Sequence, residues 1–357
     1  MTQILSNILL CLIGFISSLL MCPLVYRFAL KKQIVVTHNN HNQSIPLLGG
    51  IAVAIGIVIP IVIYLAIHPS TLLMALLPYI FVLLCIGIID DMKDLSPTLR
   101  FCIEILVVGI YAYTQYMIDL FYGLWNIEIL PIWIGLPLSV IAGVGIINSI
   151  NLIDGVDGYS SGFGIISCLI FGLFFLYCGE TTFATFLFIV VSSLLPFFFY
   201  NVFGKKKIYI GDCGTLMIGA IMSSCVFYTL SSTSSCINSI HSDMGVVAFC
   251  LATLCIPIFD TLRVMFERII RKQSPFKGDT THLHHLLMEI GLSHPQTSLT
   301  LITLNTLIIG IWWLSYKFGA SINTQLYVVL VLGMLSTFGL STILRRTISK
   351  QKQTSNK

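Results

Sequence analysis

Three carboxylates grouped at the end of a long apolar run are the first feature of the sequence that could do chemistry. Asp90 and Asp91 are adjacent, and Asp94 follows three residues later. A helix C-terminus carries partial negative charge, so carboxylates there are costly unless a metal ion or a basic group lies beside them. Arg100, which begins the next apolar run, is a candidate counter-ion or phosphate contact. The alternative is a solvated loop that only stops the helix.

A second group of polar residues repeats at every third position. It consists of Asn148, Asn151, Asp154 and Asp157. A step of three residues turns an α-helix by about 300°, so on a helix the four side chains would drift slowly around one side and line one wall of a cleft. Two glycines within the group would let the backbone leave the helix and approach a ligand closely. The alternative is a capped helix end followed by a turn.

The third group is short, and it is evidence for a site only in combination with the other groups. Gly211, Asp212 and Gly214 directly precede an apolar run, and Asn201 ends the run before it. An Asp before a helix is often only an N-cap. We nevertheless expect Asp212 to share a compartment with the other acids.

Histidines make up most of the fourth group. His282, His284 and His285 lie within four positions, and Asp279 precedes them. The spacing does not match a familiar zinc site, which needs fixed pairs of imidazoles or thiolates. Binding of a pyrophosphate group fits better with the acids elsewhere.

A charged segment precedes these histidines. Arg263, Glu267 and Arg271 are spaced four residues apart, so they can pair along one helix face. This segment also contains Asp260. We treat Arg100, Asp260, Arg263 and Asp279 as candidates for phosphate contacts or ion pairs.

Oxygen ligands dominate the four groups. A set of carboxylates and amides without thiolates favours Mg²⁺ or Mn²⁺ over zinc. A hard divalent cation held by carboxylates, with basic groups alongside, is typical of phosphoryl transfer, where the protein mainly positions groups and neutralises charge.

The elements that position these residues are membrane helices. Of 357 residues, 56% are hydrophobic and 10% charged, whereas soluble domains carry about 25% charged residues. A spanning helix needs about 20 apolar residues. We predict an all-α integral membrane protein with eleven spans, at approximately 4–26, 47–67, 72–89, 99–117, 130–149, 161–178, 183–200, 213–230, 245–267, 298–316 and 324–343.

The domain plan is simple. The first run lacks a cleavage site and is predicted to be a retained helix rather than a signal peptide. Residues 1–345 form one polytopic domain, and residues 346–357 form a basic cytoplasmic tail. Cys178 and Cys236 alone lie near predicted outer loops, and no disulfide framework is implied.

Charge predicts the orientation. With a periplasmic N-terminus and a cytoplasmic C-terminus, 18 of the 19 basic residues fall on the inner side. Most acids fall at the inner ends of helices. A secondary transporter, the main alternative from another class, would hold its charged groups near the bilayer midplane. The small net charge of +4 argues against a nucleic-acid partner.

Taken in order, the groups resemble the polyprenyl-phosphate N-acetylhexosamine-1-phosphate transferases, glycosyltransferase family 4. The resemblance covers about residues 20 to 300. The matching residues are Ile45, Pro46, Gly49 and Gly50; Asp90 and Asp91; Asn148, Asn151, Asp154 and Asp157; Asn201, Gly211, Asp212 and Gly214; and His282, His284 and His285. The first inner loop departs from the family pattern, because it is rich in Asn and His where relatives carry Arg or Lys; only His41 is carried over.

This resemblance implies a reaction: N-acetylglucosamine 1-phosphate passes from UDP-GlcNAc to undecaprenyl phosphate, UMP leaves, and cell-surface polysaccharide synthesis begins. The pattern His-Leu-His-His is similar to that branch, whereas the branch that transfers phospho-N-acetylmuramoyl-pentapeptide, the alternative, carries three consecutive histidines. The resemblance also implies a bacterial inner membrane, an active site that faces the cytoplasm, and a homodimer.

Residue roles follow from the same resemblance. It implies Mg²⁺, or Mn²⁺, held by Asp212 and Asp91, with Asp90 and Asp91 as the catalytic pair. The nucleotide-sugar site would comprise Asn148, Asn151, Asp154, Asp157, Asn201, His282, His284 and His285.

Overall fold

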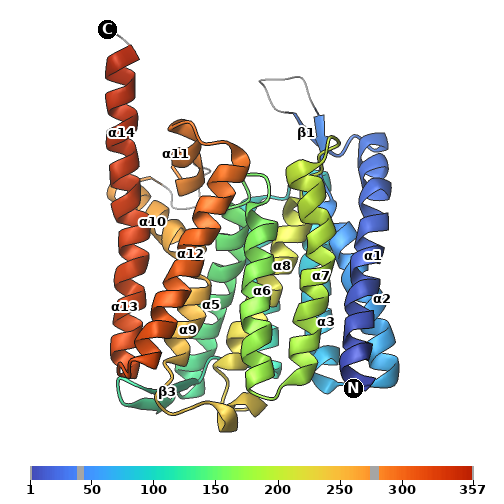
Figure 1. Ribbon diagram of the computed structural model, residues 1–357, viewed down its shortest axis with the longest axis vertical. Coiled ribbons are helices and arrows are strands. Elements are labelled where there is room, and N and C mark those ends of the chain that lie inside the picture. Colours follow the sequence, from blue (N-terminus) through green and yellow to red (C-terminus); the bar gives the residue numbers. More distant parts are fainter. Residues whose placement is uncertain (1, 38–43, 274–280, 356–357) are drawn as a thin grey trace.

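The computed structural model describes residues 2–37, 44–273 and 281–355. Its helices form one bundle with roughly parallel and antiparallel axes (Figure 1). The helices of the first half are α1 (Thr2–Lys31), α2 (Gly49–Ile67), α3 (Thr71–Lys93), α4 (Pro97–Thr114), α5 (Ile132–Leu152), α6 (Tyr159–Tyr177) and α7 (Thr181–Phe203). Those of the second half are α8 (Gly211–Thr229), α9 (Val246–Thr253), α10 (Cys255–Ile270), α11 (Leu283–Glu289), α12 (His294–Lys317), α13 (Ile322–Met334) and α14 (Leu340–Ser355).

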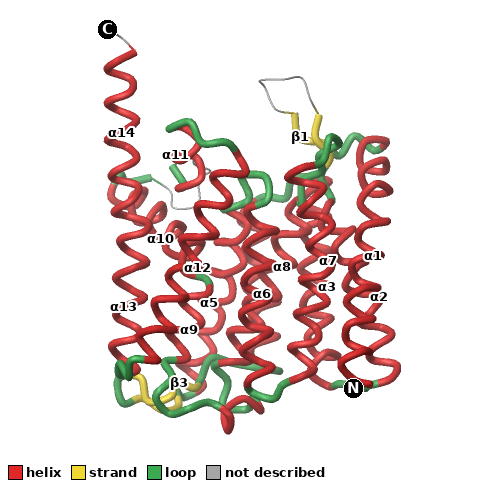
Figure 2. The backbone as a smooth tube through the Cα atoms, viewed as in Figure 1, coloured by secondary structure: helices red, strands yellow, loops and turns green. Residues whose placement is uncertain are grey.

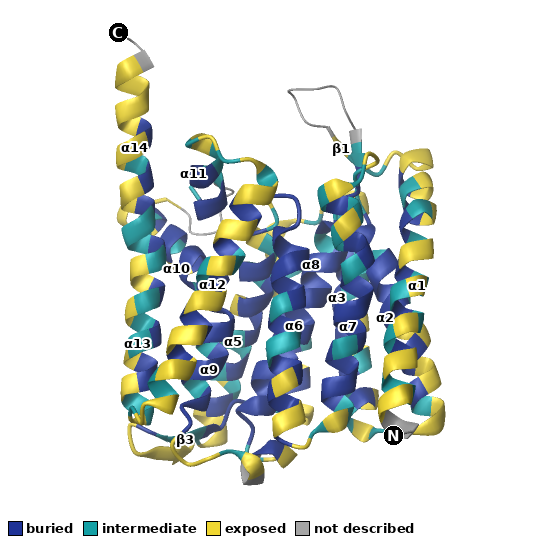
Figure 3. Ribbon diagram, viewed as in Figure 1, coloured by how far each residue is buried: buried dark blue, intermediate teal, exposed yellow. Residues whose placement is uncertain are grey.

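The number of membrane spans is confirmed. Within the described ranges, ten helices are long and apolar enough to cross a membrane, and the bent pair α9 and α10 makes eleven. The outer faces of the bundle expose large apolar side chains, among them Leu106 at 61% and Ile141 at 71% (Figure 3). A water-soluble protein rarely exposes so much contiguous apolar surface. These faces fit the hydrocarbon core of a bilayer.

Helix α8 forms the core of the bundle. Its residues from Cys213 to Thr229 are all buried, and it packs against α3 and α5. The Tyr79 hydroxyl of α3 and the Ser223 hydroxyl of α8 lie 2.8 Å apart in a hydrogen bond. Such buried polar pairs join helices in a medium where apolar contact alone gives little preference. The N-terminus of α8, where Asp212 lies, is therefore held at a fixed depth.

One predicted span is broken rather than continuous. The helix predicted over 245–267 bends by 75° between α9 and α10. Asn305 of α12 occupies the free backbone groups at the break: its Oδ1 accepts from the Ile256 N–H at 2.9 Å, and its Nδ2 donates to the Thr253 carbonyl at 3.0 Å. Pro257 has no N–H to lose at this point. The continuous span predicted here is therefore wrong, because the break is stabilised by Asn305, which is distant in the sequence.

Two short hairpins interrupt the all-α prediction (Figure 2). β1 (Val35–Thr37) pairs with β2 (Ser44–Pro46), and β3 (Leu120–Leu124) pairs with β4 (Ile127–Ile129). They lie at opposite ends of the bundle, outside the spans (Figure 1). At the turn of the second hairpin, Trp125 and Asn126 have positive φ, as tight hairpin turns require.

The last helix is longer than predicted. The span predicted over 324–343 continues through a π-helical turn, η2 (Leu335–Gly339), into α14, which projects beyond the other helices (Figure 1). All cysteines within the described ranges are free thiols, and Cys178 and Cys236 are both buried.

Candidate active site

A cavity of about 370 Å³ opens at the end of the bundle that carries the polar groups. It brings together the acids of three of the four sequence groups. Its polar lining consists of Asp90, Asp91, Asp94, Asn151, Asp154, Asp157, Ser160, Asn201, Tyr209 and Asp212. The remaining lining is apolar and includes Val36, Leu47 and Phe197.

Arg100 does not line this cavity itself but contacts three of the polar side chains that do. Its Nη1 is 2.9 Å from Asp90 Oδ2 and 3.6 Å from Asp212 Oδ2. Its Nη2 donates to Asn151 Oδ1 at 3.2 Å. Asp90 is held a second time, because its Oδ1 accepts from the Leu95 N–H at 2.8 Å. The structure therefore gives Arg100 the counter-ion position that the sequence suggested and joins the first, second and third groups through it.

Glu104 belongs to the same cluster, although the sequence reading left it out of the site. It is fully buried in α4, one helical turn from Arg100, and its Oε1 lies 3.5 Å from Arg100 Nε. Asn148 donates to its other oxygen. Asn148 therefore contacts Glu104 beneath the cavity and does not line it. The sequence did contain a signal for this residue, since a carboxylate within an otherwise apolar run is unusual and indicates a functional or structural role. Three carboxylates around one guanidinium leave the cluster with excess negative charge, which attracts cations.

Asp91 caps helix α8. Its Oδ1 accepts from the Asp212 N–H at 2.8 Å, and its Oδ2 accepts from the Cys213 N–H at 3.0 Å. These N–H groups have no partner within their own helix, and a carboxylate there also favours the positive end of the helix dipole. Gly211 makes the approach possible: its φ is +73°, and a Cβ there would lie 2.5 Å from Asp91 Oδ2. Asp91 thus fixes the backbone of Asp212.

Asp154 and Asp157 lie in the turn between α5 and α6, not on a helix. The expectation that all four members of the second group share one helical side is wrong beyond Asn151, because α5 ends at Leu152. Ser160 donates to Asp154. The pKa of the Asp154 carboxyl is raised to about 7, mainly by burial. The hydrogen bond from Ser160 lowers it, and the nearby charges of Asp212 and Asp91 contribute to the rise.

Lysine and histidine surround Asp157. Lys207 forms an ion pair with it, and His294 Nδ1 lies 3.8 Å from its Oδ2. Sequence reasoning missed both residues, since a run of three lysines at a membrane surface more often reflects topology. Asn201 is buried; its Oδ1 accepts from the Gly158 N–H at 2.5 Å, and its Nδ2 donates to the Ile208 carbonyl at 2.9 Å. It holds two loops of the cavity together.

The histidines approach the cavity from its rim. His284 packs against Gly155, where an added Cβ would lie 2.3 Å from His284 Nε2. Neither ring nitrogen of His284 has a hydrogen-bond partner among the described residues. Burial lowers the pKa of this imidazole to about 3. The His285 ring lies beside it, with ring centroids 4.1 Å apart and the ring planes tilted by 45°.

The other members of the fourth group lie behind this rim. His282 Nδ1 is 2.9 Å from Asp260 Oδ2, and Arg263 is paired with the same Asp260. None of the three lines the cavity, so Asp260 and Arg263 form an ion pair and are not placed as phosphate contacts. Asp279 and His41 lie outside the described residues.

The ligand atoms that line the cavity fit a hard divalent cation. The cavity offers carboxylate and amide oxygens, and the thiol of Cys213 is engaged with the Ile210 carbonyl. In the part of the chain that the structure describes, no three His, Cys, Asp or Glu side chains form a ready-made metal cage. Mg²⁺ does not need one, because it binds through one or two carboxylates, water and substrate phosphates. The side chain of Asp212 is 34% exposed and can reach such an ion.

Comparisons with known proteins identify the family of the chain. Residues 72–230 match the model of glycosyl transferase family 4. The chain is 31% identical over 325 residues to a probable undecaprenyl-phosphate N-acetylglucosaminyl 1-phosphate transferase of Bacillus subtilis (strain 168), covering 90% of this chain and 87% of that protein.

Two further relatives carry a similar name, undecaprenyl-phosphate alpha-N-acetylglucosaminyl 1-phosphate transferase. The Escherichia coli (strain K12) protein is 32% identical over 74% of this chain and 70% of its own length. The Salmonella typhi protein is 29% identical over 76% of this chain and 72% of its own length. The resemblance read from the motifs is thereby confirmed, and the chain belongs to glycosyl transferase family 4.

Proposed function

We propose that this protein transfers N-acetylglucosamine 1-phosphate from UDP-GlcNAc to undecaprenyl phosphate and releases UMP. The observation that carries the proposal is that Asp90 and Asp212 line one cavity at the end of the bundle and that Arg100 pairs with both of them. The names of the relatives support both the sugar and the lipid. A cavity of about 370 Å³ can hold part of a nucleotide sugar, with the rest at its rim.

The main requirement of this reaction is to neutralise the negative charges of the acceptor phosphate and the donor pyrophosphate. The second pKa of a phosphate monoester is about 6, so the acceptor is largely a dianion at neutral pH and needs no strong general base. The barrier comes from bringing it to the pyrophosphate of the donor. When bound, Mg²⁺ would reduce this repulsion, and Asp212 would be its leading ligand. Arg100 and Lys207 would add positive charge from the protein.

A direct displacement fits the carboxylates better than a covalent aspartyl-phosphate. Both oxygens of Asp91 already accept backbone N–H groups, and Asp90 is held by Arg100 and by the Leu95 N–H. Hydrogen bonds to both oxygens stabilise a carboxylate and so make it a weaker nucleophile. Asp90 would instead position the acceptor phosphate through Arg100. Exchange of UMP into UDP-GlcNAc without any lipid acceptor would contradict the direct route.

We further propose that the cavity faces the cytoplasm of a bacterial cell, at the inner membrane. The basic residues cluster at the same end as the cavity: Lys207 and Arg100 contact its acids, and the basic helix α14 projects from that end (Figure 1). Positively charged segments remain on the cytoplasmic side. Nucleotide-activated sugars are found in that compartment.

Release of UMP tests the function. Purified protein in detergent would receive Mg²⁺, undecaprenyl phosphate and UDP-GlcNAc. We expect UMP and a polyprenyl-pyrophosphoryl sugar, and no UMP from Asp212→Asn. Asp243→Asn, the same change at an exposed acid at the opposite end of the bundle, should keep full activity. Activity only with a UDP-muramoyl-pentapeptide would favour the alternative branch, and UDP as the product would exclude phosphosugar transfer.

A further inference from the structure

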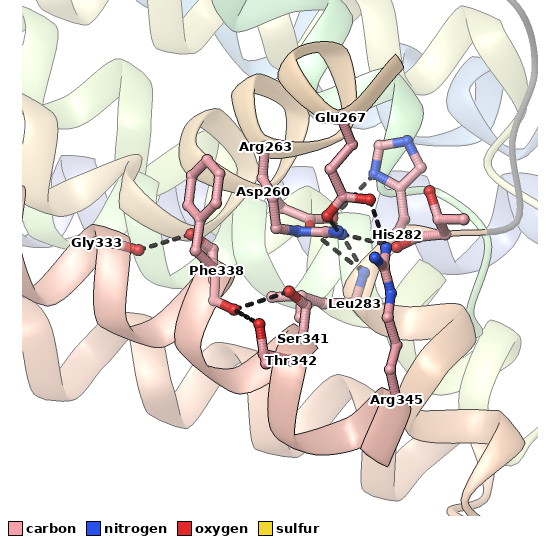
Figure 4. Close-up of polar contacts among 12 residues, drawn as sticks. Asp260, Arg263, Glu267, His282, Leu283, Gly333, Phe338, Ser341, Thr342 and Arg345 are labelled. Atoms are coloured by element: carbon pink, nitrogen blue, oxygen red, sulfur yellow. Dashed lines mark hydrogen bonds and ion pairs between the residues drawn. The ribbon is translucent and has the colours of Figure 1, made fainter. Parts of the chain in front are cut away.

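A network of ion pairs, buried at its centre and partly exposed where it meets α14, connects α10, the segment before α11 and α14 (Figure 4). Arg263, with no exposed surface, lies at its centre. Its Nη2 is 2.7 Å from Asp260 Oδ1, and its Nη1 is 2.8 Å from Glu267 Oε1. A buried charge of this kind is tolerated only when its hydrogen bonds are satisfied. The network lies outside the cavity, and the proposed reaction does not use it.

Helix α10 uses this network to hold the histidine segment, residues 281–285. Arg263 Nη2 also donates to the Thr281 carbonyl at 2.7 Å. Asp260 accepts from the Leu283 N–H at 3.3 and 3.2 Å and lies 2.9 Å from His282 Nδ1. A carboxylate from another helix therefore caps the first turn of α11. Three successive residues, 281 to 283, are fixed by two side chains of α10.

The next residue packs against the wall of the cavity. His284 follows Leu283 directly, and its ring packs against Gly155, which lines the cavity. With neither ring nitrogen engaged by the described residues, this packing gives no hydrogen bond that would set the ring's orientation. The position of His284 therefore depends on how α10 holds residues 281–283, together with its packing against Gly155 and the rings of His282 and His285.

A second arginine extends the network to the last membrane helix. Arg345 Nη2 donates to Glu267 Oε2 at 2.6 Å, whereas Glu267 Oε1 accepts from Arg263. Arg271 Nη2 lies farther from Oε2, at 3.7 Å. The π-helical turn η2 precedes α14, and such turns shift the faces that a helix presents. Side-chain hydroxyls accommodate the displaced backbone: Thr337 donates to the Gly333 carbonyl at 2.7 Å, and Thr342 donates to the Phe338 carbonyl at 2.8 Å (Figure 4).

From these contacts we propose that Arg345 and Glu267 are positioning residues for donor binding. Arg345 restrains Glu267, Glu267 restrains Arg263, and Arg263 with Asp260 holds the histidine segment at the rim of the cavity. The proposal rests on the proposed function for the identity of the donor. It predicts weaker binding of UDP-GlcNAc and unchanged binding of the lipid. The reason is that His284 packs against Gly155, which lies between Asp154 and Asp157, and the family resemblance assigns those two acids to the nucleotide-sugar site.

Arg345→Ala, compared with Arg346→Ala, provides the kinetic test. Both changes remove one arginine from α14; Arg346 is exposed and forms no ion pair with the described residues. Loss of a hydrogen bond between charged groups should raise KM for UDP-GlcNAc about tenfold in Arg345→Ala. KM for undecaprenyl phosphate should stay within about twofold of the wild type. Arg345→Lys should recover part of the effect, and Glu267→Gln combined with Arg345→Ala should add little to either single change.

Hydrogen exchange tests the coupling without any activity. Amides of residues 281–285 should exchange several-fold faster in Arg345→Ala than in the wild type, and Arg346→Ala should not differ from it. Equal exchange and equal KM values in the two variants would overturn the inference. If the wild type released no UMP, the proposed function would fail, and the exchange comparison alone would decide whether Arg345 positions this segment.

Discussion

Replacement of Arg100 by lysine is a sensitive test of the site. Lysine keeps the positive charge but presents one compact ammonium in place of a planar fork. The guanidinium contacts Asp90 at 2.9 Å, Asn151 at 3.2 Å and Glu104 at 3.5 Å through three different nitrogens. We expect lysine to keep one of these contacts and to lose the other two.

The size of the effect follows from those two lost contacts. Hydrogen bonds to charged groups contribute about 1.5 kcal/mol or more each, so about 3 kcal/mol of positioning energy is at stake. That corresponds to roughly a hundredfold loss in kcat/KM. The assay is UMP release at varied UDP-GlcNAc, with Arg346→Lys as the matched control and the thermal unfolding midpoint measured for both proteins.

Two results would refute this reasoning. Activity of Arg100→Lys within about threefold of Arg346→Lys would mean that the geometry of the guanidinium does not matter. A loss of activity that matched a fall in the fraction of folded protein would mean that Arg100 supports only the fold.

Three further predictions concern the neighbours of this group. Asp91→Asn should lower the free energy of unfolding by about 1 kcal/mol or more, which would appear as a lower unfolding midpoint. The carboxylate of Asp91 accepts hydrogen bonds from two backbone N–H groups, and in the variant one of these would face an amide nitrogen that cannot accept. Burial raises the pKa of Asp154 to about 7 in the folded protein, whereas an Asp in the unfolded chain has a pKa of about 4. The folded protein therefore binds this proton more tightly than the unfolded chain does between about pH 4 and pH 7. As pH rises across this window, the wild type should lose stability relative to Asp154→Asn. Unfolding midpoints in EDTA from pH 5 to pH 8 measure the difference, and a constant gap would contradict it. Lys207→Gln should raise KM for UDP-GlcNAc, whereas Lys206→Gln, at an exposed lysine beside it, should not; equal values for the two would remove Lys207 from the site.

Much of the membrane architecture could be predicted because apolar runs report directly on spans. The same pattern could not reveal the break between α9 and α10, since Asn305, which accommodates it, lies about fifty residues away along the chain. Neither could apolar length predict the hairpin strands, which are only three to five residues long.

The site was predictable to the extent that its residues are grouped in sequence. The clusters around Asp90, Asp154 and Asp212 meet in one cavity as expected. Residues that act alone were harder to find: Glu104 sits inside an apolar helix, Lys207 lies in an ordinary basic run, and Arg345 reaches Glu267 across 78 positions of sequence. Spacing cannot report such contacts, because the fold creates them.

The central claim is most directly tested by identifying the nucleotide product. Wild-type protein, first treated with EDTA, would be given UDP-GlcNAc and undecaprenyl phosphate with and without Mg²⁺, and the products separated by mass. The account predicts UMP and undecaprenyl-pyrophosphoryl-GlcNAc in equal amounts only when Mg²⁺ is restored, and neither from Asp212→Asn. UDP as the product, or UMP formed equally well in EDTA, would contradict it.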